Sequence, residues 1–259
     1  MEVHAHTHTP RKKWTHYLWE FIMLFLAIFC GFLAENQREH FVEHKRAKEY
    51  AKSLLNDLRD DTSELRRGIH QTKFIMTSID SIVSMSLAME PDGTVPGTFY
   101  YYSKFTFNGF RIDWSTSTLD QLIQSGSLRY FRNKELVGAI NFYYHMQGII
   151  SAQNQMDLAQ RDKIIESRNR ILQSRYYVPF SKMNIIKEEY GHVSSPGIDS
   201  LMNMKLPLQK SASEKMDEYI NNITDRKGRL ELIVERYYSL ANEVAIDIIN
   251  LLTSEFHLE

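Results

Sequence analysis

The chain opens with a polar tail and continues into an apolar stretch, Tyr17–Ala34, in which Glu20 is the single charged residue. As an α-helix this stretch would reach about 27 Å, close to the roughly 30 Å hydrocarbon core of a bilayer. No second stretch of this kind follows in the sequence. The pattern therefore predicts one transmembrane helix over residues 17–36, with the lipid bilayer as its partner.

Beyond this segment, apolar residues recur at steps of three, four or seven, the spacing of amphipathic helices. Such seams run from Phe41 to Met89, from Leu136 to Leu172 and from Met216 to Leu251, the last being the cleanest heptad pattern. No proline occurs between Arg11 and Met89, so we expect the membrane helix to continue into the first seam as one rod. The predicted fold class is all-α, with one N-terminal transmembrane helix followed by an elongated antiparallel bundle of about three long helices.

Proline and glycine divide these seams and predict irregular linkers at about 90–114 and 175–210. Within the first linker, the aromatic run Phe99–Phe107 favours β structure, but an isolated strand cannot build a sheet. We therefore expect an extended linker packed on helices. In the second, residues Lys182–Tyr190 favour a short helix.

Local signals also predict where helices begin and end. Ser115–Thr118 supply N-caps for a short helix that Ser125-Gly126 ends. Asn133 is expected to cap the next helix, and Ser211 or Ser213 the last. The resulting organisation is a flexible, His-rich basic tail (1–16), a transmembrane helix (17–36) and a helical extramembrane domain (37–259).

The apolar segment could instead belong to a cleaved signal peptide, which ends in a small-x-small site. Bulky residues continue to Leu33, and Ala34-Glu35-Asn36 gives no convincing site, so we expect a retained anchor. The cations Arg11-Lys12-Lys13 cluster close to the membrane, whereas those on the other flank are spread out. This favours a signal anchor with its N-terminus inside and the large domain outside.

Composition narrows the function classes. Thirty-one basic and thirty-two acidic residues leave a net charge of −1, so nucleic acid is not an expected partner. The single cysteine, Cys30, lies in the apolar segment, which excludes an internal disulfide framework elsewhere. Phosphate loops, nucleophile elbows and zinc-protease motifs are missing from the sequence. We predict no enzyme activity, no catalytic residue and no cofactor.

Glu20 is the sharpest candidate site residue, because an acid in a membrane segment is costly and often functional. It could lie hydrated at the interface or paired with His16 at i−4, contact another helix, or conduct ions. Flagellar-stator type subunits share this layout of a short tail, one membrane helix with an acid and an external domain. We favour the interfacial interpretation.

Two weaker patterns concern oligomer and metal contacts. Ala27 and Gly31, with Cys30 and Ala34 beside them, place small residues where two membrane helices could pack closely. They make a homo-oligomer, or another membrane protein, the expected partner. The imidazoles of His4, His6 and His8 could bind zinc, copper or nickel, but a flexible tail fixes no geometry, so we predict no metal site.

Tyrosine pairs and triplets recur along the chain, at Tyr100–Tyr102, Tyr143-Tyr144, Tyr176-Tyr177 and Tyr237-Tyr238. They could line a ligand groove. We favour residues at the edge of the core, with their hydroxyl groups directed to water.

Two stretches carry a resemblance. The run HTHTPRKKWTHYLWEFIMLFLAIFCGFLAENQREH resembles the start of uncharacterised single-pass membrane proteins of Bacteroidota. The segment Ser115–His145, STSTLDQLIQSGSLRYFRNKELVGAINFYYH, resembles an element of related domains of unknown function. The resemblance implies a helical protein of the bacterial inner membrane with a periplasmic domain, and it transfers no active or binding residue.

The leading hypothesis is thus a membrane-anchored helical scaffold or protein-interaction module. Its rivals are a periplasmic sensor-like ligand-binding domain, which a polar pocket between the helices would favour, and an ion-coupled stator-like subunit using Glu20.

Overall fold

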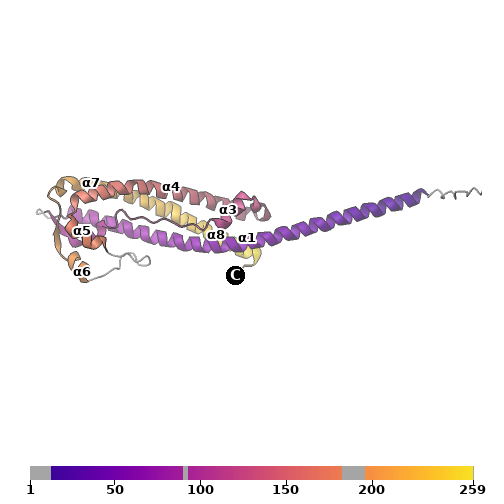
Figure 1. Cartoon of the computed structure of the whole chain (residues 1–259), viewed down its shortest axis with the longest axis horizontal. Helices are drawn as coiled ribbons and strands as arrows, with labels where there is room; N and C mark the ends of the chain where they lie inside the picture. Colours follow the sequence, from indigo (N-terminus) through magenta and orange to yellow (C-terminus); the bar gives the residue numbers. More distant parts are fainter. Residues whose placement is uncertain (1–12, 90–92, 183–195, 259) are drawn as a thin grey trace, which may run out of the picture. The chain divides into compact units, whose positions relative to one another are not determined.

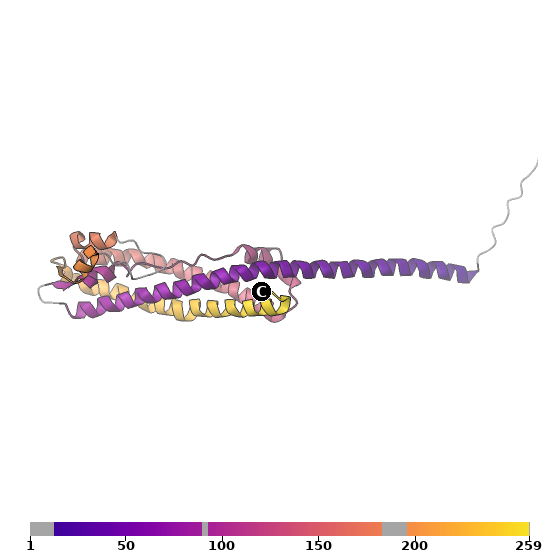
Figure 2. The same cartoon turned by 90° about the horizontal axis from the view of Figure 1, so that it is seen from below.

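The computed structural model describes residues 13–89, 93–182 and 196–258 (Figures 1 and 2). The chain divides into two units, Met1–Tyr50 and Ala51–Glu259. Helix α1, Trp14–Leu87, begins in the first unit and ends in the second, with 74 residues and no interruption. The predicted continuous helix is confirmed, because nothing in this proline-free stretch breaks the hydrogen-bonded ladder.

The part of α1 in the first unit carries the apolar segment. From Tyr17 to Asn36 every side chain except that of Ile22 is exposed. An 18-residue window of this helix has a mean hydropathy of 2.1, and none of it is buried. Among the described residues, α1 is the one helix long and apolar enough to span a membrane.

Three helical rods lie side by side in the second unit: the remainder of α1, helix α4 (Lys134–Ile171) and the C-terminal rod. The C-terminal rod consists of α7 (Ala212–Leu232), a π-helical stretch η2 (Ile233–Tyr238) and α8 (Ser239–Phe256). The all-α class is confirmed. The C-terminal rod runs antiparallel to the other two, whereas α1 and α4 point the same way (Figure 1).

This parallel pair exists because the chain returns along the bundle before α4 begins. Residues 104–116, here called the return segment, lead from α2 back to the short helix α3 (Figure 1). They contain almost no regular structure, and they cover the side of α4 that carries the pocket described below.

The core lies along the predicted seams, except at the two ends of the first one, where Phe41 is 70% and Leu87 is 86% exposed. Each rod presents leucine, isoleucine and alanine side chains at helical spacing that are at most 4% exposed. They include Leu54, Leu58, Leu65, Ile75, Ile79 and Ile82 from α1, Leu136, Ile140, Ile150, Ile164 and Ile171 from α4, and Ile223, Leu230, Ala241, Ala245, Ile248 and Leu252 from the C-terminal rod. Burial of this apolar surface is the main stabilising contribution to the unit.

The linker expected at 90–114 is more ordered than predicted. Strand β1, Thr94–Pro96, pairs antiparallel with β2, Lys205–Pro207, and places Val95 opposite Leu206. Helix α2 follows at Gly97–Ser103, so the prediction that Phe99–Phe107 is extended was wrong. Burial explains the difference: Phe99 and Tyr100 are fully buried, and this packing overrides their β propensity.

The linker expected at 175–210 likewise contains regular structure, namely α5 (Ser174–Ser181), α6 (Pro196–Met202) and β2. The short helix predicted at Lys182–Tyr190 falls on 183–195, outside the described residues, apart from Lys182. The Tyr100 hydroxyl ties this end of the unit together. It donates to the Pro207 carbonyl at 2.7 Å and accepts the Gln173 N–H at 3.0 Å.

Helix α3, Ser117–Gln124, was predicted, but not its cap. The N-cap residue, Thr116, makes no side-chain capping hydrogen bond. Instead Asp57 of α1 accepts the first-turn Thr118 N–H at 3.3 Å, and Asp61 accepts the Ser115 N–H just before the helix at 2.8 Å. A negative charge at this end also complements the helix dipole. The helix ends as expected, with Gly126 in the left-handed region (φ 66°), before a 3-10 turn, η1 (Ser127–Tyr130).

The sequence analysis placed the start of the C-terminal rod correctly, but its capping hydrogen bond is not formed. Ser211 is its N-cap residue, although its side chain makes no capping hydrogen bond. The π-helical turn at η2 was not predicted, and the Ser239 hydroxyl supports it by donating to the Val234 carbonyl at 2.9 Å.

Asn133 caps α4 as predicted. Its side-chain oxygen accepts the N–H groups of Glu135 and Leu136 at 2.9 and 3.2 Å. Asn133→Ala should lower the free energy of unfolding by about 1 kcal/mol, because these amides lose their partner. Chemical denaturation of the full chain in detergent measures the effect.

Asn141→Ala is the matched control, since Asn141 is exposed within α4 and alanine is the better helix former. Equal destabilisation by the two variants would contradict the capping role.

Candidate functional site

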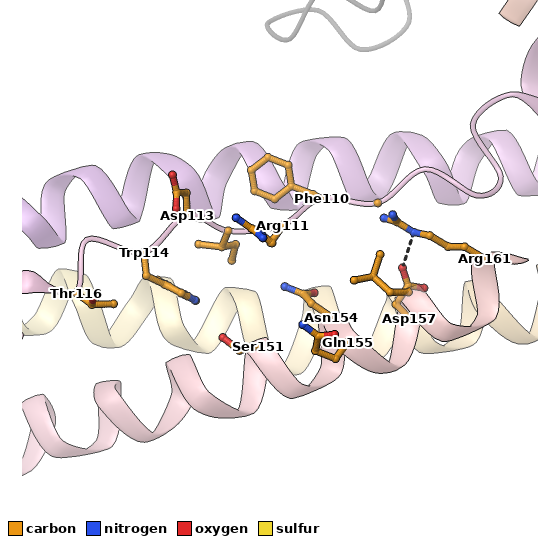
Figure 3. Close-up of a pocket in the computed structure, with 13 residues that line it drawn as sticks. Phe110, Arg111, Asp113, Trp114, Thr116, Ser151, Asn154, Gln155, Asp157 and Arg161 are labelled. Carbon is orange, nitrogen blue, oxygen red and sulfur yellow. Dashed lines mark ion pairs between the residues drawn. The ribbon is translucent and has the colours of Figure 1, made fainter. Parts of the chain in front are cut away.

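A pocket lies in the second unit, between the return segment and α4. Its volume is about 570 Å³, within the range typical of small-molecule sites. Residues 109–114 and Thr116 line one side, and Ser151, Asn154, Gln155, Asp157, Leu158 and Arg161 of α4 line the other (Figure 3). The lining contains aromatic and aliphatic side chains together with side chains that can form hydrogen bonds.

A buried ion pair supports one end of this pocket. Arg226 of α7 is fully buried, and its Nε and Nη2 each donate to a carboxylate oxygen of Asp157 at 2.7 Å. Its Nη1 donates to the Thr106 carbonyl and its Nη2 also to the Asn108 carbonyl, both in the return segment. One guanidinium therefore joins α7, α4 and the return segment, with its charge compensated in a bidentate geometry.

Two neighbouring contacts secure the same stretch of the return segment. The buried hydroxyls of Tyr219 and Thr106 lie 3.0 Å apart. The Arg168 guanidinium of α4 lies over the Phe107 ring, 4.6 Å from its centroid. Such a stacked cation adds to the attachment of residues 106–108.

Arg161 lies one helical turn after Asp157, at the pocket wall. Its Nε is 3.7 Å from Asp157 Oδ2, and its side chain is 26% exposed (Figure 3). A Cβ placed on Gly109 would overlap the Arg161 guanidinium. The guanidinium can therefore pack against the backbone of the return segment only because residue 109 is glycine.

The π-helical stretch η2 reaches the pocket through Tyr238. Its hydroxyl donates to Oδ1 of the pocket residue Asn154 at 3.0 Å. Burial raises the pKa of Tyr238 to about 12, so it remains a donor at neutral pH. π-Helical turns often occur at functional sites, and this one positions a group on the pocket wall.

A second buried acid, Asp61, lies next to the other end of the return segment. It is 1% exposed and accepts hydrogen bonds from the Ser115 N–H, the Tyr143 hydroxyl (2.8 Å) and the Gln147 amide (3.2 Å). Burial raises the pKa of this carboxyl, and the hydrogen bonds only partly oppose that effect. Trp114 of the pocket packs edge-on against the Tyr143 ring.

This arrangement is suited to binding. Both oxygens of Asp157 are occupied by Arg226, and the Ser151 hydroxyl donates to the Gln147 carbonyl at 2.8 Å. Neither group is therefore poised as a base or a nucleophile, for which a matched proton-transfer partner is needed. Residues in the described part of the chain form no group of three or more His, Cys, Asp or Glu side chains that could hold a metal ion.

The site residues predicted from sequence lie in the first unit. Glu20 Oε1 is 3.1 Å from Nε2 of His16 at i−4, and both side chains are about half exposed, which is the pairing weighed above. Ala27, Gly31 and Ala34 are exposed on α1, and space is open around Gly31. His4, His6 and His8 fall outside the described residues.

The sequence analysis missed the charged residues of the core. Arg226 follows Ile223 and precedes Leu230 at seam spacing, and Asp61 stands between Leu58 and Leu65 in the same way. A charge on an apolar seam was therefore the available signal. The prediction of water-facing tyrosines was wrong for Tyr100, Tyr143 and Tyr238, which are at most 1% exposed and whose hydroxyls bond within the protein. Tyr144, which is 41% exposed, agrees with it.

Comparison with known proteins gave no relative: no protein-family model, curated protein or solved structure matches the chain.

The raised pKa of Asp61 predicts a pH-dependent stability. The Asp61 carboxyl binds its proton more tightly in the folded chain than in the unfolded chain. Protonated Asp61 therefore stabilises the fold below the ordinary aspartate pKa, and this stabilisation is lost as the pH rises through the raised pKa of the folded state. Asp61→Asn cannot ionise. The difference in free energy of unfolding, variant minus wild type, should therefore shift in favour of the variant as pH rises from about 4 to 8.

Denaturant titrations at several pH values measure this difference. Asp60→Asn, the same substitution at the exposed neighbour, is the control. A profile for Asp61→Asn that matches this control would contradict the buried-charge account.

Proposed function

We propose that the chain is a membrane-anchored helical scaffold or interaction module. The observation that carries the proposal is the exposed apolar part of α1, whose most apolar window is entirely unburied. Exposing so much contiguous apolar surface to water is unfavourable, and a bilayer removes it. In this proposal the chain is not an enzyme and needs no cofactor.

The proposed location is the bacterial inner membrane, with the N-terminus in the cytoplasm and the second unit in the periplasm. The cation cluster Arg11-Lys12-Lys13 before the apolar segment supports this orientation. The resemblance of the N-terminal run to Bacteroidota membrane proteins supports the compartment. The family assignment itself remains a proposal.

The proposed partner is a second copy of the chain or another membrane protein. Ala27 and Gly31, four residues apart on an exposed helix, allow close approach of a second helix, as does Ala34 one turn on. The filled apolar core of the second unit supports a structural role. Ion coupling through Glu20 gains no support from the structure, because Glu20 is paired with His16 in its own helix.

Ligand binding is the second candidate function. The pocket of about 570 Å³ between α4 and the return segment favours it, because polar and aromatic groups from separate parts of the chain converge there. A domain held at a membrane by one helix and carrying such a pocket has the parts of a sensor-like module.

The anchor is tested by introducing charge into the apolar segment. Phe25→Arg with Phe29→Arg should move most of the protein out of the carbonate-resistant membrane fraction, since each arginine near the bilayer centre costs about 2.5–3.5 kcal/mol. Phe142→Arg is the control, because Phe142 is 42% exposed on α4 and lies outside the segment. Immunoblotting of membrane and soluble fractions measures the shift.

Wild-type protein in the soluble fraction would refute the anchor. The orientation of the protein in the membrane is measured in the same cells with a Cys30→Ser, Ser213→Cys variant. Its one thiol replaces Ser213, an exposed residue of α7. An impermeant maleimide should label it in intact spheroplasts, and labelling only after lysis would reverse the proposed topology.

A further inference from the structure

We propose that the pocket binds an uncharged ligand in which an amide group, a carboxamide or a lactam, is attached to an apolar body. The amide lies against Trp114, Asn154 and Ser151, and the apolar body against Ile112 and Leu158. This inference rests on the second candidate function, ligand binding by this pocket.

Two N–H donors, on Asn154 and Trp114, line the pocket. The Tyr238 hydroxyl donates to Oδ1 of Asn154 at 3.0 Å, which fixes the orientation of that amide and leaves its Nδ2 as a donor. The indole Nε1 of Trp114 can only donate. Within residues 13–89, 93–182 and 196–258, neither nitrogen forms a hydrogen bond. Figure 3 shows the indole nitrogen on the edge of the Trp114 ring that points toward Asn154, so one ligand oxygen can accept from both.

The Ser151 hydroxyl supplies the complementary acceptor. Its proton is donated to the Gln147 carbonyl at 2.8 Å, which leaves its oxygen as an acceptor for a group in the pocket. An amide matches this arrangement, because its carbonyl oxygen has two lone pairs for the two N–H donors and its own N–H donates to Ser151. A carboxylate lacks this N–H, and an alcohol has one oxygen for both tasks.

The charged groups around the pocket do not select an ionised ligand. Arg226 occupies both oxygens of Asp157, and Arg161 lies 3.7 Å from the same carboxylate. Arg111 and Asp113 also line the pocket, but they are exposed and have opposite signs. An ionised ligand would lose hydration here without gaining a counter-charge of its own, so an uncharged ligand is favoured.

The apolar part of the lining fits a compact hydrocarbon body. Ile112 of the return segment is 4% exposed, and Leu158 of α4 is 42% exposed, so covering Leu158 removes apolar surface from water. The ring of Trp114 adds a flat face beside them. A ring or a branched alkyl group attached to the amide can pack against these side chains within the volume of about 570 Å³.

The test follows the indole N–H resonance of Trp114 by NMR in the full-length chain in detergent. Trp14→Phe with Trp19→Phe makes Trp114 the one tryptophan, since the sequence has three. The probes are cyclohexanecarboxamide, cyclohexanecarboxylate and cyclohexylmethanol, which share the ring and differ in the polar group. We expect the amide to move the resonance downfield with a Kd of about 1 mM, because its carbonyl accepts the indole proton. The acid and the alcohol should bind about 10-fold more weakly.

Two further variants on this background locate the contact. Asn154→Asp should weaken amide binding about 10-fold or more, because it replaces the Nδ2 donor with an acceptor of the same size. Tyr238→Phe should reduce the preference for the amide over the alcohol to about 3-fold, because the Asn154 side chain loses the bond that fixes its orientation. Asn141→Asp is the matched control, the same substitution on α4 at an exposed residue outside the pocket lining.

Each remaining outcome overturns a defined part of the account. If the acid or the alcohol binds as tightly as the amide, or Asn154→Asp binds the amide like the control, the amide assignment fails while ligand binding survives. An unchanged preference in Tyr238→Phe would overturn the positioning role of the Tyr238 hydroxyl. If none of the three probes moves the resonance at about 10 mM, both the assignment and the ligand-binding function fail.

Discussion

The buried guanidinium of Arg226 is the interaction that fixes how α7, α4 and the return segment pack on one another. A fully buried cation is tolerated only when its charge and its N–H groups are satisfied. Asp157 supplies the charge, and the Thr106 and Asn108 carbonyls accept the remaining bonds. Because these partners come from α4 and the return segment, satisfying Arg226 requires the whole arrangement of α7, α4 and residues 106–108. The group thus selects one packing of the rods from the many that apolar seams alone would allow.

The pocket follows from the same constraint. The return segment is held near one end by Arg226 and near the other by Asp61, which accepts the Ser115 N–H. Between these points it bridges over α4 with little regular structure, and the space beneath it is not filled by a helix seam. Arg161 enters at Gly109 and Tyr238 secures Asn154, so the groups facing this space are held by neighbours.

The sequence correctly predicted those features of the fold that depend on interactions between residues close together in the chain. Asn133, Gly126 and the proline-free stretch before Met89 each act within a few residues, and the structure has the cap, the stop and the continuous helix where they were expected. The elements that were missed depend on distant partners. Arg226 bonds to a carbonyl 120 residues away, and the carboxylate that accepts the Ser115 N–H stands 54 residues before it. Spacing along one seam shows a charge in the core, but it does not show which distant group will neutralise it.

The central claim is that Arg226 holds the return segment on α4, and amide hydrogen exchange of full-length Arg226→Lys in detergent tests it most directly. Lysine keeps the charge opposite Asp157 but cannot reach both carbonyls and both carboxylate oxygens. The account predicts faster exchange across residues 105–110, while the Ser115 amide, which Asp61 holds, and the core amides around Ile248 and Leu252 of α8 keep their wild-type protection. Wild-type exchange across 105–110 in this variant would contradict it.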